Sequence, residues 1–295
     1  MNNWTSIRTD DTLKETVQHG NAAYPFAYYL ENIWDFDFHC MDWHWHHELE
    51  FISVVEGTAI CYAGTDMLKV PAGCGMFINS SVLHRFEATA SALIPNIVFS
   101  PGLLAPENSL IYQKYILPVL HSRISWQLFS PQIAWQGQIL DILAQIYRLQ
   151  EQETDTELAT LRLLLKLWDI LVRNLDIPDG EKALARPDHR QARLQIMMQY
   201  IHDNYRTELT LEQIASAASV SKSSALQIFH SGIHLSPVAY LIQYRLTQAA
   251  GLLYTTRKPV SAIAQETGFA SAGYFCRKFK ERYQMSPKEY RAKKV

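Results

Sequence analysis

Imidazole and carboxylate side chains gather in one short stretch of the chain, His44-Trp45-His46-His47-Glu48-Leu49-Glu50. In an extended strand, His44, His46 and Glu50 would point to the same face, because alternate residues do so. Imidazole and carboxylate groups are ligands that suit zinc, iron, manganese or nickel. On a straight strand, however, His44 and Glu50 would lie about 20 Å apart. They can share one ion only if the chain bends sharply at His47-Glu48-Leu49.

A second set of residues, near the end of the chain, is suited to contact with nucleic acid. The sequence from Gly268 to Lys280 reads as a tight turn followed by a helix with a basic face. Fifty residues earlier, the sequence from Ser221 to Phe229 repeats that layout. Two short helices joined by a turn, the second of them exposed, place a helix in the major groove of DNA. The repeat therefore predicts two DNA-reading units, at about 210–231 and 260–283.

The elements around these units have clear start signals. Thr210-Leu211-Glu212-Gln213 and Ser286-Pro287-Lys288-Glu289 are capping boxes. Between the units, apolar residues three and four apart predict one long helix over 237–254. Such a spacer would hold the reading helices about 34 Å apart, which is one turn of duplex DNA. The second unit carries one extra turn residue, at Gly268-Phe269.

Helical position identifies the side chains of the two reading helices that face outward. The predicted DNA-contacting residues are Lys222, Ser223, Leu226, Gln227, Ala272, Gly273, Cys276, Arg277, Lys278 and Lys280. Arg277 is the best candidate for base recognition, because a guanidinium can pair bidentately with guanine. Gln227 can pair in the same way with adenine. The lysines are expected to contact phosphates, which positions a protein without reading sequence.

The distribution of charge supports this prediction. The chain has a formal net charge of −2, with 27 Lys and Arg against 29 Asp and Glu. From Asp188 onward there are 15 basic against 7 acidic residues, a net charge of +8, whereas the preceding residues carry −10. A basic portion attached to an acidic one is the electrostatic signature of nucleic-acid binding by one domain only.

The last hundred or so residues resemble the DNA-binding domain of AraC/XylS transcriptional regulators. The second half of the family pattern is matched by Gly268, Phe269, Ser271, Tyr274, Phe275, Arg277, Phe279, Lys280, Ser286, Pro287, Tyr290 and Arg291. The first half departs from it, because Ala225, Gln227 and His230 stand where leucine, arginine and lysine are usual. His234 and Gln284 replace glycines that end helices in a left-handed conformation, at a cost of about 1 kcal/mol each.

The first hundred residues differ in kind. Short alternating segments with Gly and Pro between them predict strands at 36–39, 50–55, 58–62, 67–70, 75–78 and 94–99, which suggests a small antiparallel barrel or jelly roll. The histidine-rich stretch, with Gly57, Gly73 and His84, resembles the two cupin motifs, although Asn79-Ser80-Ser81 replaces the usual Pro-x-Gly of the second. AraC/XylS regulators often carry such a barrel as an effector sensor.

The cupin resemblance places His44, His46, Glu50 and His84 inside the barrel. We expect them, with Trp45 and Trp34, to bind a small-molecule effector, and the family resemblance favours a carbohydrate. Aromatic faces can stack on sugar C–H surfaces while polar groups take the hydroxyls. The same four residues, His44, His46, Glu50 and His84, are the candidate ligands of a divalent metal ion. In regulators of this kind the pattern need not mean a bound metal, so both interpretations stay open.

Two helices are predicted between the barrel and the DNA-reading units, at 133–150 and 158–175. The second is apolar around much of its girth, so it must bury more than one side. Its second side can lie against another copy of the chain, giving a homodimer, or be buried within one chain. Residues 177–188, with Pro178, Gly180 and Pro187 among charged neighbours, read as a flexible linker.

The predicted fold class is α+β and multidomain. Residues 1–105 are expected to form the cupin-like barrel with an N-terminal arm, 106–176 a helical dimerisation segment, 177–188 the linker, and 189–295 an all-α domain with two helix-turn-helix motifs. No run of eighteen apolar residues and no leader is seen, so no membrane partner is expected. The four cysteines lack paired metal-ligand spacing and suit a reducing cytoplasm.

These observations predict a cytoplasmic, sequence-specific transcriptional regulator, and not an enzyme. Its expected partners are double-stranded DNA, a small-molecule effector, a second copy of the chain and RNA polymerase. Effector binding would shift the placement of two DNA-binding domains and so change which half-sites they occupy. The alternatives are a metal-dependent cupin enzyme with a DNA-binding tail and a regulator that acts without a ligand.

Overall fold

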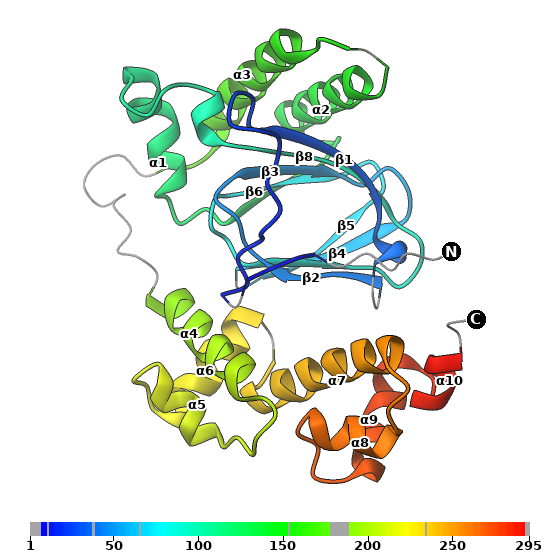
Figure 1. The fold of residues 1–295 in the computed structure, drawn as a ribbon. Helices are drawn as coiled ribbons and strands as arrows, with labels where there is room; N and C mark the ends of the chain where they lie inside the picture. Colours follow the sequence, from blue (N-terminus) through cyan, green and yellow to red (C-terminus); the bar gives the residue numbers. More distant parts are fainter. Residues whose placement is uncertain are drawn as a thin grey trace. The chain divides into compact units, whose positions relative to one another are not determined.

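The computed structural model describes residues 7–10, 12–36, 39–64, 66–152, 154–177, 189–233 and 235–292. The chain divides into two compact units, Met1–Asp188 and His189–Val295, and each is described by itself (Figure 1). Most of the predicted linker lies outside the described residues. No helix among the described residues is both long enough and apolar enough to cross a membrane.

The first unit is built on two antiparallel sheets. The strands are β1 (Phe26–Asn32), β2 (Cys40–His44), β3 (Leu49–Ser53), β4 (Thr58–Ala63), β5 (Asp66–Pro71), β6 (Gly75–Ile78), β7 (His84–Glu87), β8 (Leu93–Phe99) and β9 (Trp126–Phe129). One sheet has the order β1-β8-β3-β6-β9 and the other β2-β7-β4-β5. The sheets form two facing layers in Figure 1. Apart from the β4–β5 hairpin, neighbouring strands in both sheets are not consecutive in sequence, which is the jelly-roll-like arrangement that the sequence predicted.

Strand alternation explains how the five-stranded sheet buries both faces. In β3, Phe51 packs in one apolar cluster and Ile52 in another. The cluster of Ile52 includes Cys61 and Phe86 of the opposite sheet, so it fills the space between the layers. The cluster of Phe51 lies on the other face and is covered by helices. Alternate residues of one strand therefore serve two cores.

The covering helices are α2 (Ala134–Gln152) and α3 (Glu157–Asn174), drawn across the outer face of the sheet in Figure 1. Leu143 of α2 and Leu167 of α3 pack in the same cluster as Phe51. Shorter turns precede them: η1 (Ile33–Asp35), η3 (Pro101–Leu103), the π-helical η4 (Tyr112–Ile116) and α1 (Leu117–Leu120). The segment predicted as purely helical also supplies an edge strand, β9.

The strand predicted over 36–39 differs in position from the observed strand β2. His39 has a backbone φ of 55°, in the left-handed region that an extended strand excludes. The strand predicted over 36–39 therefore does not include His39; residues 37 and 38 lie outside the described residues, and β2 begins at Cys40.

The second unit is all helical. Its helices are α4 (His189–Asn204), α5 (Leu211–Ala217), α6 (Lys222–Ile233), α7 (Pro237–Thr255), α8 (Val260–Glu266), α9 (Ala272–Tyr283) and α10 (Pro287–Ala292). The pairs α5–α6 and α8–α9 are the two helix-turn-helix units, and α7 contacts helices of both. The predicted fold class is confirmed in both units.

A set of contacts at the middle of α7 joins the two helix-turn-helix units. Arg245 of α7 donates hydrogen bonds to the carbonyls of Tyr205 (2.7 Å) and Thr207 (2.6 Å), in the loop before α5. Gly268, in the turn between α8 and α9, has a φ of +81°, and a Cβ there would lie 2.3 Å from the Tyr205 carbonyl oxygen. Only glycine combines this conformation with this close approach. The turn that carries the extra residue of the second helix-turn-helix unit thus packs against the loop that precedes the first helix-turn-helix unit.

Candidate functional site

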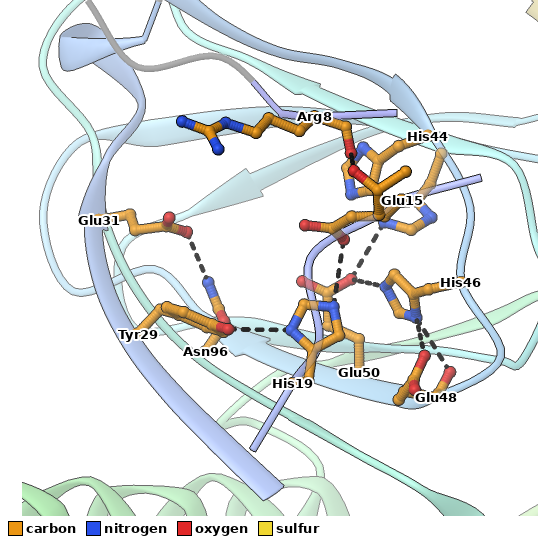
Figure 2. A network of polar contacts seen from close by, with 12 residues as sticks. Arg8, Glu15, His19, Tyr29, Glu31, His44, His46, Glu48, Glu50 and Asn96 are labelled. Carbon is orange, nitrogen blue, oxygen red and sulfur yellow. Dashed lines mark hydrogen bonds and ion pairs between the residues drawn. The ribbon is translucent and has the colours of Figure 1, made fainter. Parts of the chain in front are cut away.

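The chain makes the sharp bend that a shared site requires. β2 ends at His44 in the four-stranded sheet, and β3 begins at Leu49 in the five-stranded sheet. His44 pairs in register with His84 of β7. The Oε2 atom of Glu50 lies 3.1 Å from Nε2 of His84 and 3.5 Å from Nε2 of His46. The three imidazoles and the carboxylate therefore meet between the two layers, as Figure 2 shows for the labelled His44, His46 and Glu50.

Backbone carbonyls fix how the three rings present their nitrogens. Nδ1 of His44 donates to the Asp42 carbonyl (2.7 Å), Nδ1 of His84 to the Val82 carbonyl (2.9 Å), and Nδ1 of His46 to the Glu48 carbonyl (3.2 Å). A carbonyl oxygen can only accept, so each Nδ1 carries the proton. In a neutral ring the Nε2 atom is then a bare lone pair. This is the orientation by an outer partner that is typical of metal-binding histidines.

Hydrogen-bond acceptors, each with a free lone pair, thus face one another in a buried place. His44, His46, Glu50 and His84 are at most 4% exposed. Oε2 of Glu50 and Nε2 of His84 make no hydrogen bond of good geometry, although they are only 3.1 Å apart. Two arrangements satisfy these atoms: a divalent cation among them, or a proton on one Nε2 that pairs with Glu50. An ionised carboxylate buried without either would be severely destabilising.

The pKa shifts of His44 and Glu50 are consistent with metal ligation. Burial, with the neighbouring His84 as a second cause, lowers the pKa of His44 to about 3, so its ring is neutral. Burial would raise the pKa of Glu50, but contacts with His46 and His84 outweigh it and hold that pKa below its ordinary value. Neutral imidazoles and an ionised carboxylate are the forms that bind metal.

The donor set also fits a metal ion in its spacing. Ligand atoms of His44, His46 and His84 all lie within 4.8 Å of one another. Nitrogen donors with one carboxylate suit first-row transition ions. The four residues that the sequence grouped as metal ligands are therefore brought together, and they fit such an ion.

Further polar residues, which were not predicted from the sequence, surround this cluster. Glu15 and His19 precede β1 and contact each other at 3.2 Å. His19 also contacts the Tyr29 hydroxyl (2.9 Å), and Glu31 accepts from the Asn96 amide (3.0 Å) (Figure 2). Tyr29 and Glu31 alternate along β1, a pattern that could have revealed them. Glu15 and His19 lie outside regular elements and gave no such signal.

Glu31 leads to a prediction about pH. Burial, reinforced by the nearby Glu50 and Glu15, raises the pKa of Glu31 from 4.5 to about 7. Because the folded pKa is the higher one, ionisation of Glu31 opposes folding, increasingly as pH rises from 4.5 to 7. In the metal-free protein, Glu31→Gln should stabilise the first unit by about 1–3 kcal/mol at pH 8, and the gain should shrink by about 2 kcal/mol at pH 5.

Urea unfolding followed by tryptophan fluorescence measures this effect in the first unit alone, because all 7 tryptophans precede residue 189. An equal difference between Glu31→Gln and the unaltered protein at both pH values would contradict the assignment.

The two tryptophans predicted for the pocket do not join the imidazole cluster. Trp45 alternates with His44 and His46 and therefore points to the opposite side, where its Nε1 donates to the Thr12 carbonyl (2.9 Å). Trp34 belongs to η1, is 37% exposed and stacks on His39 with ring centroids 3.6 Å apart. The site is accordingly lined by carboxylates and imidazoles rather than by indoles.

The second candidate surface lies on α6 and α9. Of the predicted contact residues, Lys222, Ser223, Leu226, Gln227, Gly273, Arg277 and Lys280 are exposed, and Ala272, Cys276 and Lys278 are half-buried. The opposite faces hold the core residues Ala225, Ile228, Phe229, Phe275 and Phe279. The guanidinium of Arg277 lies 5.3 Å from the Tyr274 ring centroid. Both helices thus leave the predicted contact face uncovered by their own unit.

Local signals position these helices. The Ser271 side chain caps α9 by accepting from the Tyr274 amide (3.2 Å), and Ser221 does the same for the Ser224 amide at the start of α6 (3.1 Å). Gln284 ends α9 with a φ of 53°, the left-handed conformation expected at that position. His234, which is the counterpart of Gln284 after the first helix-turn-helix unit, lies outside the described residues.

Comparisons with known proteins match both parts of the chain. Residues 190–293 match a helix-turn-helix domain family, and residues 32–167 match the AraC-like ligand binding domain family. The HTH-type transcriptional regulator AlkR of Acinetobacter baylyi is 31% identical over 262 residues, covering 79% of this chain and 81% of that protein. The HTH-type transcriptional regulator YdeC of Bacillus subtilis is 28% identical over 286 residues, covering 96% and 97%. The HTH-type transcriptional activator RhaS of an Enterobacter species is 25% identical over 251 residues, covering 83% and 86%.

Proposed function

Because this chain belongs to the AraC family of transcriptional regulators, with a helix-turn-helix domain and an AraC-like ligand-binding domain, we propose that it is a regulator whose barrel uses a divalent metal ion in sensing its effector. The ion would be held by His44, His46, Glu50 and His84. The observation that carries the proposal is the set of buried acceptors facing one another, with each Nδ1 proton already used by a carbonyl. When bound, a transition ion would supply Lewis acidity to an oxygen ligand.

The charge of the site favours a neutral, hydroxyl-bearing effector. Four carboxylates, those of Glu15, Glu31, Glu48 and Glu50, lie in or around the cluster. They would repel an anion, whereas hydroxyl groups can donate hydrogen bonds to them. A sugar or polyol meets this requirement, so we propose a carbohydrate-like effector. To regulate, it must bind free and DNA-bound protein with affinities that differ, by about 1–3 kcal/mol if the coupling is typical.

The outer side of α3 supports a homodimer. Leu164, Leu167, Trp168 and Leu171 are buried, whereas Leu158 is 81% and Leu165 is 43% exposed. Exposed leucines on a helix whose other side is already packed fit contact with a second copy of the chain. A cytoplasmic location and RNA polymerase as a further partner stay predictions.

The rival proposal is a metal-dependent cupin enzyme with a DNA-binding tail. We disfavour it because full-length relatives are named as transcriptional regulators. The rival predicts substrate turnover that is lost in His46→Ala while DNA binding is kept.

Genome-wide occupancy of the native protein, before and after metal loading, tests the proposal. We expect a few discrete sites and, in protein purified without chelators, about one transition-metal ion per chain. Chelation should then change the effect of sugars or polyols on binding to a recovered site. No discrete sites under several growth conditions would overturn the DNA-reading role. Discrete sites with no metal in fresh or reloaded protein would overturn the metal site alone.

A further inference from the structure

The N-terminal segment (residues 12–19) is attached to the edge of the imidazole cluster. Lys14 forms a parallel bridge with Trp45. The Glu15 amide donates to the Trp45 carbonyl (2.9 Å), and the Trp45 amide donates to the Leu13 carbonyl (3.0 Å). The backbone of the segment is thus held directly beside the residue that separates His44 from His46.

This register decides which side chains of the segment face the cluster. Lys14 and Trp45 lie on the same, outer side, with the Lys14 ammonium 5.7 Å from the indole centroid. Their neighbours Leu13 and Glu15 therefore point inward, as His44 and His46 do. Leu13 is 7% exposed, and the Glu15 side chain is 8% exposed. A carboxylate is thus aimed at the imidazoles from outside the strands that carry them.

The surroundings of Glu15 place it within the site. Its Oε2 atom lies 3.2 Å from Nε2 of His19, whose ring packs edge-on against that of His46 with centroids 5.5 Å apart. In Figure 2 the Glu15 carboxylate lies above that of Glu50 in the view and is joined to His19 by a dashed line. The second carboxylate at the rim, Glu48, approaches His46 from the Nδ1 side, at 3.8 Å, and so lies away from the bare Nε2 atoms.

The net charge of the metal site favours Glu15 as a ligand. Three neutral imidazoles and Glu50 would leave a divalent ion with a net charge of +1 in a buried site. A second carboxylate makes the site neutral, and uncompensated buried charge is strongly unfavourable. We propose that Glu15 is a further ligand of the metal ion and that metal loading pins the N-terminal segment to the cluster. This inference rests on the metal site proposed above.

The test uses the full chain and cobalt(II), whose visible absorption reports its ligand number and geometry. Cobalt affinity is measured by titration of chelator-treated protein, and exchange of backbone amides in residues 12–19 is measured by hydrogen–deuterium exchange. Glu15→Gln keeps the shape and can still hydrogen-bond His19. We expect it to weaken cobalt binding at least about 10-fold, to change the absorption spectrum, and to abolish the slowing of exchange on metal loading.

Glu48→Gln is the matched control, because it removes one negative charge next to His46 without removing an inward-facing carboxylate. It should keep the spectrum and the protection of the segment. Thermal melting without metal checks that Glu15→Gln and Glu48→Gln fold. Glu15→Asp is a further variant at the same position, and its shorter carboxylate should bind cobalt more weakly than Glu15 does.

The outcomes separate the two proposals. If the unaltered protein binds no cobalt, both the metal site and the role of Glu15 fail. If it binds cobalt but Glu15→Gln has the same affinity, spectrum and exchange, the metal site stands and the role of Glu15 is overturned. A loss of affinity of equal size in Glu15→Gln and Glu48→Gln, with unchanged spectra, would show a general charge effect and would also overturn it.

Discussion

His84→Gln is expected to reduce the affinity of the chain for a divalent transition ion at least about 100-fold. The imidazole of His84 offers a bare Nε2 atom 3.1 Å from the Glu50 carboxylate. Loss of outer partners of a metal ligand costs about 10–100-fold, and loss of the ligand itself should cost more. Since an ion that binds only the folded state stabilises it, the melting temperature of the unaltered protein should rise with added zinc or manganese. That of His84→Gln should not.

His47→Gln is the control for this experiment. His47 belongs to the same histidine-rich stretch, but it is exposed, and its Nδ1 lies 3.1 Å from the Ser81 hydroxyl. It should respond to metal as the unaltered protein does. If His84→Gln showed an undiminished metal response, Glu50 would have to be satisfied by a proton on an imidazole, and the metal proposal would be withdrawn.

Arg277→Ala is expected to cost about 1–3 kcal/mol of binding free energy at the protein's operator and to relax specificity at one base position. The Arg277 side chain is 67% exposed, and its nearest acidic neighbour, Glu281, is 4.0 Å away, so little has to be broken before it meets a base. Competition binding with operator duplexes substituted at each position would measure both effects.

Lys280→Ala provides the contrast, because Lys280 is exposed on the same helix and is assigned to a phosphate. Its loss should weaken binding evenly across sequences and reduce the slope of log affinity against log salt by about 1. Should Arg277→Ala give the same uniform loss, its role in reading a base would be refuted.

Local patterns in the sequence account for much of the fold. The strand at Thr58–Ala63 alternates, and the helix at Pro237–Thr255 has a cap, a proline and periodic apolar residues, so both were predicted within one residue of their observed ends. The strands β1, β7 and β9 were missed. Each is defined by pairing with strands that are distant in sequence rather than by a local pattern.

In the candidate site, too, residues in a recognisable motif were predicted and residues placed by distant contacts were not. The resemblance to the two cupin motifs identified the four clustered residues, three of them in the histidine-rich stretch and the fourth, His84, after Gly73. It misplaced Trp45, since strand alternation turns that ring away from its neighbours. Glu15 was beyond reach, because its position follows from backbone bonds between the N-terminal segment and Trp45 rather than from any local period.

The contacts of Arg245 and Gly268 have a consequence for the DNA as well as for the protein. They attach the second helix-turn-helix unit to the loop that precedes the first. The two reading helices are therefore held at a fixed distance and orientation. A fixed distance between the reading helices also fixes the position, around the axis of the duplex, of the two sets of bases that one chain reads. Inserting about five base pairs between those sets would rotate one to the opposite face of the duplex, out of reach of its helix. Operators should therefore keep a fixed spacing between the two base sets that one chain reads.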